Sequence, residues 1–491
     1  MRFDTRSMGS ALARHMDVAR VAVETSPDSE DAHDMVAFVV PSERVLQRVR
    51  RSTRERRLGE WRMVYGSVYE DQTDPMGFGE NFAEWTSSYD RRPIDRVQME
   101  EWRSRTVDTI LSLRPRKVLE IGAGSGLILS RVAPRCESYW ATDLSEEAVR
   151  ILAGAVGRDP GLTDVVEVRH QPAHDFEGLP TGLFDTVVLN SVVQYFPDSD
   201  YLLDVLEGVL TALAPGGTIL LGDIRNRRSL RCLYTAAELQ GADGGTPVER
   251  IREGAEERLL RERELLLEPG FFASLPRVLD TVSAVDVRLK RGEHHNELTR
   301  HRYDVLLYTR PVEGLPLDGA VRLDWGSRIR DERTLTAYLT EHRPSVLRLD
   351  GVPDARLAGE LGALRALEEG RPLTSVIDTL HGEAPTGALD PETCHEVGAH
   401  FGYEVRATCS VREEGCFDVV LVSDVPSETP LTLCPPATTA ATRGGDTTLL
   451  NGESVTAFEK ALRAHLARVF ENIPLPKTKF VITEELPCDR N

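Results

Sequence analysis

Three closely spaced glycines and a following acidic residue are the features of this sequence best suited to hold a small molecule. The stretch KVLEIGAGSG, from Lys117, places Gly122, Gly124 and Gly126 directly after an apolar run. Glycine is needed where a backbone turns sharply and a ligand approaches closely, because a Cβ would clash. Asp143 ends the next apolar run, where an acid can accept hydrogen bonds from both hydroxyls of a ribose. The pattern predicts a nucleotide-type cofactor.

The spacing of the glycines narrows the kind of cofactor. The motif reads ExGxGxG from Glu120, and Leu127 and Ile128 follow it, so the third glycine of the dinucleotide fingerprint GxGxxG is missing. That glycine lets a helix pack closely near a bound pyrophosphate, so an NAD-dependent oxidoreductase is disfavoured. A tight turn without a ligand is the alternative interpretation of GAGSG alone.

The elements around the motif must form a parallel sheet to bring such residues together. Residues 117–121 and 138–143 are predicted strands, with an opening helix, LILSRVAPR, between them. Further strands are predicted at the start of 165–176, in 184–197 ending at Asn190 and Ser191, and in 219–226, with a helix over 201–213. Ligands bind beyond the carboxyl ends of such strands. We therefore expect Asp143, residues 173–175 and residues 190–195 to line one crevice.

Composition sets the broad class. With 491 residues the chain exceeds the roughly 250–300 at which one core stops growing, so several domains are expected. A net charge of −20 repels phosphate backbones, so nucleic acid is not an expected partner. No apolar run suits a membrane span, and the first residues show no secretion signal, so a cytoplasmic protein is expected. Seven cysteines without a CxxC pair indicate neither structural zinc nor a disulfide scaffold.

Longer motifs carry a resemblance to a known family. The segments FDTVVLNSVVQYFPDSDYLLDVLEGVLTALAPGG, GDIRNRRSL and RGEHHNELTRHRYDVLL resemble the methyltransferase domain of nonribosomal peptide synthetases, as do residues 82–94 and 389–422. The resemblance implies a class I, Rossmann-like α/β methyltransferase fold with S-adenosylmethionine (SAM) as cofactor. It implies as partner a carrier protein bearing an aminoacyl-phosphopantetheine, together with an adenylation domain or other synthetase modules.

The two ends of the chain carry a second resemblance. Residues 2–41 and 458–491 resemble the first and last parts of the carboxy-terminal subdomain of an adenylation domain. The methyltransferase is therefore interpreted as an insertion, as in interrupted adenylation domains. The large adenylation subdomain is missing, and the chain stops before the family's catalytic lysine, so no adenylation is expected. A fragment of a synthetase and a free-standing enzyme with relic flanks both remain open.

These comparisons give an expected domain organisation. Aromatic residues in the charged segment ahead of the core (Trp61, Tyr65, Tyr69, Trp85 and Tyr89) indicate either a lid over the cofactor or ordinary core packing. We expect the first part of the adenylation subdomain at 1–45, a helical lid at 46–105, the methyltransferase core at 106–310, an appended α/β subdomain with one amphipathic helix and two strands at 311–425, a linker at 426–448 and the second part of the adenylation subdomain at 449–491.

The cofactor residues follow from the motif and the resemblance. For His174 and Asp175 the resemblance implies contact with the adenine amine, whereas Glu120 is expected to secure the glycine loop. The predicted SAM-binding residues are Glu120, Gly122, Ala123, Gly124, Gly126, Asp143, Leu144, His174, Asp175, Asn190, Ser191, Trp85 and Tyr89.

Catalysis requires mainly positioning, because the sulfonium already activates the methyl carbon of SAM for in-line displacement. An attacking amine must be neutral and must lose a proton afterwards. Asn190 and Gln194 could orient the amine through their carbonyl oxygens, and Tyr195 could pack on the methyl–sulfur axis. Arg225 could hold a thioester carbonyl or pair with Asp223.

The segment HHNELTRHRYD, residues 294–304, supplies the candidate proton acceptors His295 and Glu297. Its spacing matches no metal motif, so no metal is expected, and polar residues that structure a loop are the alternative interpretation. The predicted function is SAM-dependent N-methylation of the backbone amine of an aminoacyl or peptidyl thioester on a carrier protein. O- or S-methylation of a side chain and a non-catalytic docking module are the alternatives.

Overall fold

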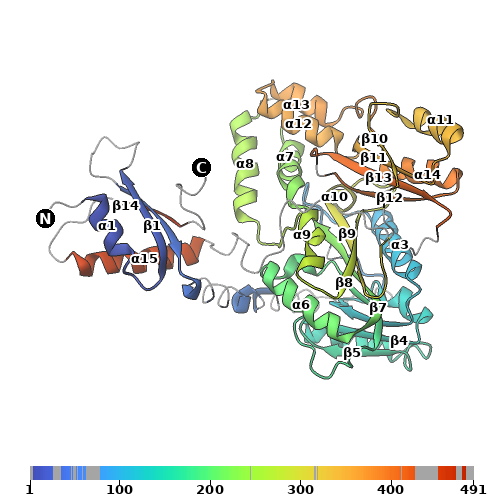
Figure 1. The fold of residues 1–491 in the computed structure, drawn as a ribbon, viewed down its shortest axis with the longest axis horizontal. Coiled ribbons are helices and arrows are strands. Elements are labelled where there is room, and N and C mark those ends of the chain that lie inside the picture. Colours follow the sequence, from blue (N-terminus) through green and yellow to red (C-terminus); the bar gives the residue numbers. More distant parts are fainter. Residues whose placement is uncertain are drawn as a thin grey trace. The chain divides into compact units, whose positions relative to one another are not determined.

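The computed structural model divides into two units, Met1–Trp61 with Gly444–Asn491 and Arg62–Arg443 (Figure 1). The predicted linker, residues 426–448, lies outside the described residues, as do Tyr65 and Tyr69. The residues that the structure describes are 4–25, 35–45, 47, 51, 54–57, 59–61, 78–83, 85–243, 245–314, 317, 319–410, 412–425, 452–470 and 478–482.

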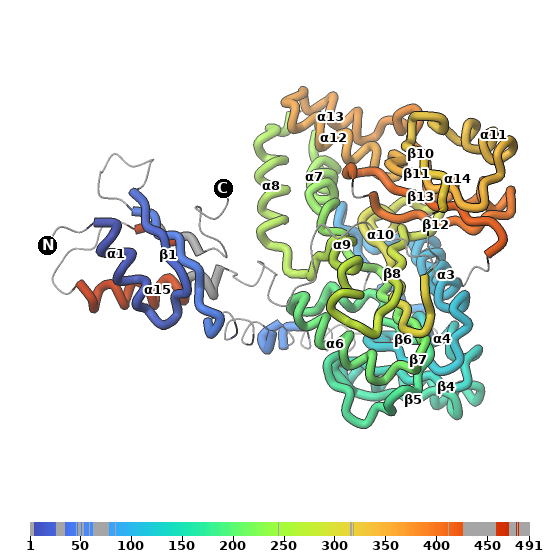
Figure 2. The backbone as a smooth tube through the Cα atoms, viewed as in Figure 1, coloured from blue at the N-terminus to red at the C-terminus, as the bar shows by residue number. Residues whose placement is uncertain are grey.

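The smaller unit joins the two ends of the chain in one sheet. Strands β1 (Val18–Thr25) and β2 (Met35–Pro41) pair antiparallel, and β14 (Thr478–Ile482) adds to β2 in parallel. Figure 2 shows these blue and red segments side by side. Helices α1 (Thr5–Leu12) and α15 (Gly452–Val469) supply buried residues to its core, among them Met8, Leu12, Phe458 and Leu462.

The larger unit is built on a seven-stranded sheet of order β5-β4-β3-β6-β7-β9-β8. Strands β3 to β7 run parallel, and β9 runs antiparallel between β7 and β8. The predicted, mostly parallel α/β sheet is thus confirmed. The bounds are β3 (Lys117–Ile121), β4 (Ser138–Asp143), β5 (Val166–His170), β6 (Phe184–Asn190), β7 (Leu213–Arg225), β8 (Val282–Leu289) and β9 (Arg302–Thr309).

Local chemistry moves several boundaries from those expected. The opening helix α4 covers only Leu129–Val132 and continues as a 3-10 turn, Ala133–Arg135, where Pro134 lacks the N–H that an α-helix needs. Helix α6 begins at Ser199, because the Asp198 carboxylate caps it by accepting the Tyr201 N–H. The other helices of this part are α3 (Arg96–Ser112), α5 (Glu146–Val156), α7 (Leu230–Gln240), α8 (Val248–Arg261), α9 (Pro269–Ala273) and α10 (Glu297–His301).

The appended subdomain has a sheet of its own, of order β10-β11-β13-β12. The expectation of two strands was wrong, because this sheet has four. Strand β10 (Val321–Asp324) was hard to predict because it is short and mostly exposed. Strand β11 (Val346–Pro353) was hard to predict because buried Asp350 interrupts its apolar run. The sheet is completed by β12 (Tyr403–Cys409) and β13 (Cys416–Ser423), with helices α11 (Glu332–His342), α12 (Ala358–Glu368), α13 (Leu373–Leu380) and α14 (Pro391–His400).

The appended subdomain packs on the part of the larger unit that contains the seven-stranded sheet. Helices α12 and α13 share a buried apolar cluster with α7 and α8, in which Leu239 and Ile251 meet Ala363, Leu367 and Val376 (Figure 1). Strand β12 lies against β8. The core and the appended subdomain therefore belong to one compact unit.

Candidate functional site

The glycine loop connects β3 to α4 at the carboxyl edge of the sheet. Gly122, Gly124 and Gly126 all have positive φ, at 78°, 52° and 78°. A Cβ on Gly122 would lie 2.4 Å from Cγ2 of Val192, and one on Gly126 would lie 2.7 Å from Cδ1 of Leu152. The loop therefore depends on glycine both for its conformation and for the space that it leaves.

Asp143 fixes the tip of β4 to this loop. Its Oδ2 accepts the Gly124 N–H at 2.9 Å, and its Oδ1 accepts the Ser145 N–H at 2.8 Å. Burial raises the pKa of Asp143 above its usual value, while the two backbone donors oppose that shift. A carboxylate held beside a turn of glycines fits the ribose of a nucleoside cofactor, so these residues fit the adenosyl group of SAM.

Glu120 lies one layer below the loop. Its side chain is buried and its Oε2 accepts the Tyr139 hydroxyl at 2.8 Å. Burial raises the pKa of Glu120 to about 8, so the side chain is mostly neutral at pH 7. Its observed partner is Tyr139 of β4 rather than an N–H of the glycine loop.

The carboxyl end of β6 places two amide side chains near the loop. Val192, which follows this strand, is the residue that a Cβ on Gly122 would strike. Among the residues that the structure describes, the carbonyl oxygens of Asn190 and Gln194 are buried and have no hydrogen-bond partner. The Gln194 Nε2 donates to the Ser191 carbonyl at 3.0 Å, which fixes the orientation of its amide. Tyr195 is half-buried in the 3-10 turn Val193–Tyr195.

Asp223, at the carboxyl end of β7, contacts side chains from several segments at this edge of the sheet. It is fully buried and has a φ of 67°, and its Oδ2 accepts the Ser191 hydroxyl at 2.8 Å and Arg302 at 2.7 Å. Its Oδ1 accepts the Trp102 Nε1 at 3.2 Å, and the Nζ of Lys290 lies 3.7 Å away. Burial alone would raise the pKa of Asp223, but Arg302 and Lys290 outweigh it and hold that pKa below its usual value.

Arg225 does not pair with Asp223, which was one of the two roles expected for it; its contact with a thioester carbonyl stays a prediction. Its guanidinium pairs with Glu262 and Glu264, at 2.8 Å each, and Asp223 pairs with Arg302 instead. The cause is a register shift between Leu221 and Ile224 together with the positive φ of Asp223, which breaks the regular alternation of side chains along β7.

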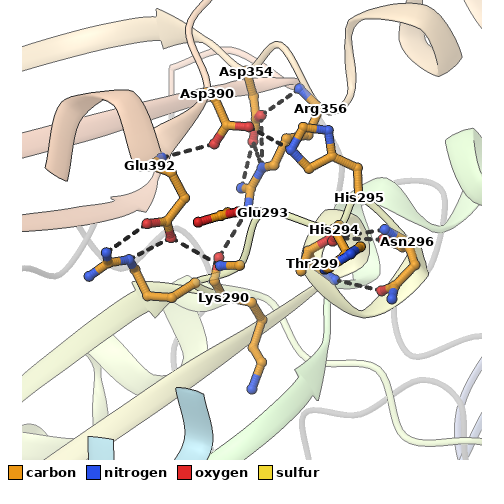
Figure 3. Close-up of polar contacts among 12 residues, drawn as sticks. Lys290, Glu293, His294, His295, Asn296, Thr299, Asp354, Arg356, Asp390 and Glu392 are labelled. Carbon is orange, nitrogen blue, oxygen red and sulfur yellow. Dashed lines mark hydrogen bonds and ion pairs between the residues drawn. The ribbon is translucent and has the colours of Figure 1, made fainter. Parts of the chain in front are cut away.

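The two candidate proton acceptors separate in the structure. Glu297 is buried at the start of α10, accepts the N–H of Ser88 and the Ser88 hydroxyl at 3.0 Å, and lies 3.9 Å from Arg302. It therefore belongs to the same edge as Asp223. The Nε2 of His295 instead lies 2.6 Å from Oδ2 of Asp390, on the appended subdomain (Figure 3).

The segment before α10 is fastened to the appended subdomain by further ion pairs (Figure 3). Arg356 is buried, donates to the Lys290 carbonyl at 3.0 Å and pairs with Asp354 at 2.8 Å. Arg291 pairs with both oxygens of Glu392, at 2.5 and 2.6 Å. The backbone of Lys290 is thus held by one subdomain while its side chain reaches Asp223 in the other.

The predicted lid aromatics divide between two places. Trp85 packs on Trp102 at 4.6 Å between ring centroids and lies under the Arg302 guanidinium at 5.7 Å. The hydroxyl of Tyr89 donates to Glu360 of α12 at 2.6 Å and lies 3.3 Å from His301. Trp61 belongs to the smaller unit.

The residues expected near the adenine have local partners. The Nδ1 of His174 lies 2.7 Å from the Tyr201 hydroxyl, and the Asp175 carboxylate accepts the Glu177 N–H at 2.9 Å. Leu144 accepts a hydrogen bond from His170 at 3.0 Å through its carbonyl. Contact of His174 or Asp175 with an adenine stays a prediction.

Sequence reasoning missed Trp102, Lys290 and Arg302. Lys290 and Arg302 each stand among other basic residues at the end of an apolar strand, so no sequence signal distinguishes them from their neighbours. In the part of the chain that the structure describes, no group of three or more His, Cys, Asp or Glu residues is placed to hold a metal ion. No described helix is both long and apolar enough to cross a membrane.

Comparison with known proteins agrees with this geometry. Residues 119–219 match the family model described as a methyltransferase domain. The chain is 36% identical over 378 residues to chondramide synthase cmdD of Chondromyces crocatus, covering 74% of this chain and 10% of that protein. Residues 119–219 thus match a methyltransferase domain, and most of the chain is similar to a part of a nonribosomal peptide synthetase. SAM is the cofactor expected of this domain.

Two further synthetases show the same relation. The probable non-canonical nonribosomal peptide synthetase CymA of Salinispora arenicola is 35% identical over 421 residues, covering 85% of this chain and 5% of that protein. Enniatin synthetase of Fusarium oxysporum is 30% identical over 464 residues, and the match covers 88% of this chain and 14% of that protein. The methyltransferase chain thus spans a small part of the length of these relatives.

Among solved structures, the N-methyltransferase NodS of Bradyrhizobium japonicum, in complex with S-adenosyl-L-homocysteine, is 16% identical. The match covers 43% of this chain and 88% of that one, with a TM-score of 0.27. A SAM-dependent methyltransferase of Clostridium acetobutylicum matches 43% of this chain and 91% of that one at 15% identity, with a TM-score of 0.30.

The glycine loop can be tested by adding one methyl group. We expect Gly122→Ala to weaken SAM binding at least about tenfold, because its Cβ would meet Val192 and displace the loop. Gly182→Ala is the matched control, since Gly182 also has a positive φ, of 65°, but has nothing within 4 Å of a Cβ. Calorimetric titration of both variants checks this, and equal affinities would contradict it.

The raised pKa of Glu120 predicts a pH dependence of stability. The folded protein keeps this proton up to about pH 8, whereas the unfolded chain releases it near the usual value of 4.5. The folded state binds the extra proton in that window, so the free energy of unfolding falls as the pH rises through it. Between about pH 5 and 8 the wild type should lose up to about 4 kcal/mol relative to Glu120→Gln.

Urea unfolding of the two proteins at a series of pH values measures this difference. The glutamine variant stays neutral at every pH, so the comparison removes the contribution of all other titrating groups. Parallel pH profiles for the two proteins would show that Glu120 is ionised in the folded state and would refute the prediction.

Proposed function

We propose that this chain is an N-methyltransferase that transfers the methyl group of SAM to the backbone amine of an aminoacyl or peptidyl thioester. The thioester would be carried on the phosphopantetheine arm of a carrier protein during nonribosomal peptide biosynthesis in the cytoplasm. The relation to peptide synthetases supports the pathway, and the edge of the sheet between β6 and β7 supports the choice of nucleophile.

One observation carries the choice of an amine: the buried, unpaired carbonyl oxygens of Asn190 and Gln194, in the described part of the chain. Leaving such an atom without a donor costs about 1–3 kcal/mol, so a ligand that supplies a donor is stabilised there. A neutral primary amine has two N–H donors and one lone pair. In this proposal it would donate one N–H to each oxygen, and its lone pair would then point away from them, toward the methyl group.

A hydroxyl or a thiol has a single donor and would leave one of the two oxygens unpaired. This difference disfavours O- or S-methylation. The N-methylated product also has one N–H fewer in its neutral form, so it binds less well than the substrate, which would assist release and limit a second methylation. A non-catalytic docking module would gain nothing from two unpaired buried acceptors.

The remaining residues take supporting roles in this proposal. The glycine loop and Asp143 would hold the adenosyl and methionine parts of SAM, with Ser191 beside them, and His174 or Asp175 would contact the adenine. Bound SAM supplies the electrophilic methyl carbon. The chain's own contribution is to place the amine in line with the sulfur–carbon bond and to exclude water, with Tyr195 and Trp85 as walls.

The proton released after transfer needs an acceptor. Glu297 is the better of the two candidates, because its carboxylate is buried at the same edge as Asp223 and lies 3.9 Å from Arg302. His295 is paired with Asp390 at 2.6 Å, which turns it toward the appended subdomain.

Removal of one carbonyl oxygen tests the proposal. We expect Gln194→Met, which keeps the length of the side chain, to lower kcat/KM for an aminoacyl thioester about 10- to 100-fold, because one N–H of the amine loses its acceptor. The affinity of Gln194→Met for SAM should stay within about threefold of that of the wild type. The fragment masses of the product should place the methyl group on the backbone nitrogen.

Gln171→Met serves as the matched control, since Gln171 is also buried but its amide donates to the Glu177 carbonyl at 3.0 Å, outside the β6–β7 edge. It should leave kcat/KM nearly unchanged. Equal losses in the two variants would show a general packing effect, and a product methylated on a side chain would refute N-methylation.

A further inference from the structure

A groove of about 520 Å³ lies between the segment before α3 and helices α7 and α8. Its size suits a small molecule, since ligand sites usually span roughly 300–1,000 Å³. The walls are lined mainly by hydroxyl-bearing and charged side chains. Thr86, Ser87, Ser88 and Arg91 form one wall, and Tyr234, Glu238, Gly254, Glu257, Arg258, Arg261 and Glu262 form the other.

The ion pairs of the groove do not include Arg91. Glu238 pairs with Arg258 at 2.6 Å, and Glu257 pairs with Arg261 at 3.3 Å. Glu262 pairs with Arg225 at 2.8 Å, from below the groove. Within the described residues, the guanidinium of Arg91 has no ion pair or hydrogen bond. The groove therefore offers one guanidinium, that of Arg91, which none of its carboxylates pairs with.

The backbone fixes where that charge is presented. Arg91 sits in a tight turn in which its N–H donates to the Ser87 carbonyl at 2.8 Å and the Ser87 N–H donates to the Arg92 carbonyl at 2.8 Å. Its φ is 58°, a conformation that long side chains adopt only at a cost. The next residue, Arg92, carries the same charge but does not line the groove, and it lies 3.9 Å from Asp90.

The floor of the groove leads to the methyl-transfer edge. Ser88 lines the groove, and its N–H and hydroxyl both bond to Glu297. Glu297 lies 3.9 Å from Arg302, which pairs with Asp223 at 2.7 Å. Arg258, on the opposite wall, donates to the Ser88 carbonyl at 3.0 Å. The side chains of Glu297, Arg302 and Asp223 thus connect Ser88 of the groove to Ser191.

We propose that this groove binds the phosphopantetheine arm of the acyl substrate, with Arg91 pairing with the phosphate at its outer end. The hydroxyls of Thr86, Ser87 and Ser88 would bond the amides of the arm, and the thioester end would point toward Glu297. The identity of the ligand rests on the proposed function. Its location in this groove rests on the residues that line the groove.

Direct binding tests the site without any methyl transfer. Phosphopantetheine, pantetheine and inorganic phosphate would each be titrated into the full chain and into Arg91→Asn and Arg92→Asn. Asparagine suits the positive φ of Arg91, so the first variant keeps the turn, and both variants lose one charge. The neighbouring arginine is thus a matched control for charge.

We expect the wild type to bind phosphopantetheine about tenfold or more tightly than pantetheine or phosphate alone, since the phosphate adds a charge-assisted bond to those of the amides. Arg91→Asn should remove that advantage and Arg92→Asn should keep it. The proposal would be overturned if the wild type bound phosphopantetheine and pantetheine with equal affinity. It would also be overturned if Arg91→Asn bound phosphopantetheine as tightly as the wild type does, or if Arg92→Asn lost as much affinity as Arg91→Asn. Preference for inorganic phosphate would indicate a simple anion site and would overturn it too.

Failure of this inference can be told from failure of the proposed function. If the arm binds as expected but no aminoacyl thioester is methylated, the inferred binding site is supported and the proposed N-methylation is refuted. If aminoacyl-phosphopantetheine is N-methylated with the same KM by Arg91→Asn as by the wild type, the proposed N-methylation is supported and the inferred binding site for the arm is refuted.

Discussion

The buried carboxylate of Asp223 is the interaction on which the functional edge of this protein depends. An ionised group that is removed from water must be paired and hydrogen-bonded, or it becomes strongly destabilising. Asp223 meets that demand with hydrogen bonds from Ser191 after β6, Trp102 of α3 and Arg302 at the start of β9. A fourth segment supplies the charge of Lys290, after β8, at 3.7 Å. Its pairing therefore fixes the relative positions of all four.

This constraint explains how the appended subdomain bears on the site. Arg356 holds the backbone of Lys290, and the Lys290 side chain pairs with Asp304 at 2.9 Å beside Asp223. The Tyr89–Glu360 bond and the Arg291–Glu392 pair fasten the segment before α3 and the loop before α10 to the same subdomain. Hydrogen bonds and ion pairs from the appended subdomain thereby hold these segments beside the edge that Asp223 organises.

The sequence predicts the local features well. The glycine loop, the strands that end at Asp143 and Asn190, and the mostly parallel sheet all follow from apolar periodicity and turn residues within short windows. The partners of Asp223 could not be predicted in this way, because Trp102 and Arg302 lie far from it in the chain and only the folded sheet brings them together. The expected pairing of Arg225 with Asp223 was wrong, since a register shift in β7 cannot be detected from side-chain alternation. Two strands of the appended sheet were missed because charged residues interrupt them.

The central claim is that the glycine loop and Asp143 form a SAM site. The most direct measurement is a calorimetric titration of SAM into the full chain, Asp143→Ala and Asp185→Ala. Asp185 is a matched control, because its carboxylate also accepts backbone N–H groups, at Arg116 and Lys117, but at the opposite end of β3. The account predicts saturable binding that is lost in Asp143→Ala and kept in Asp185→Ala. A well-folded wild type that does not bind SAM, or binding that survives in Asp143→Ala, would contradict it.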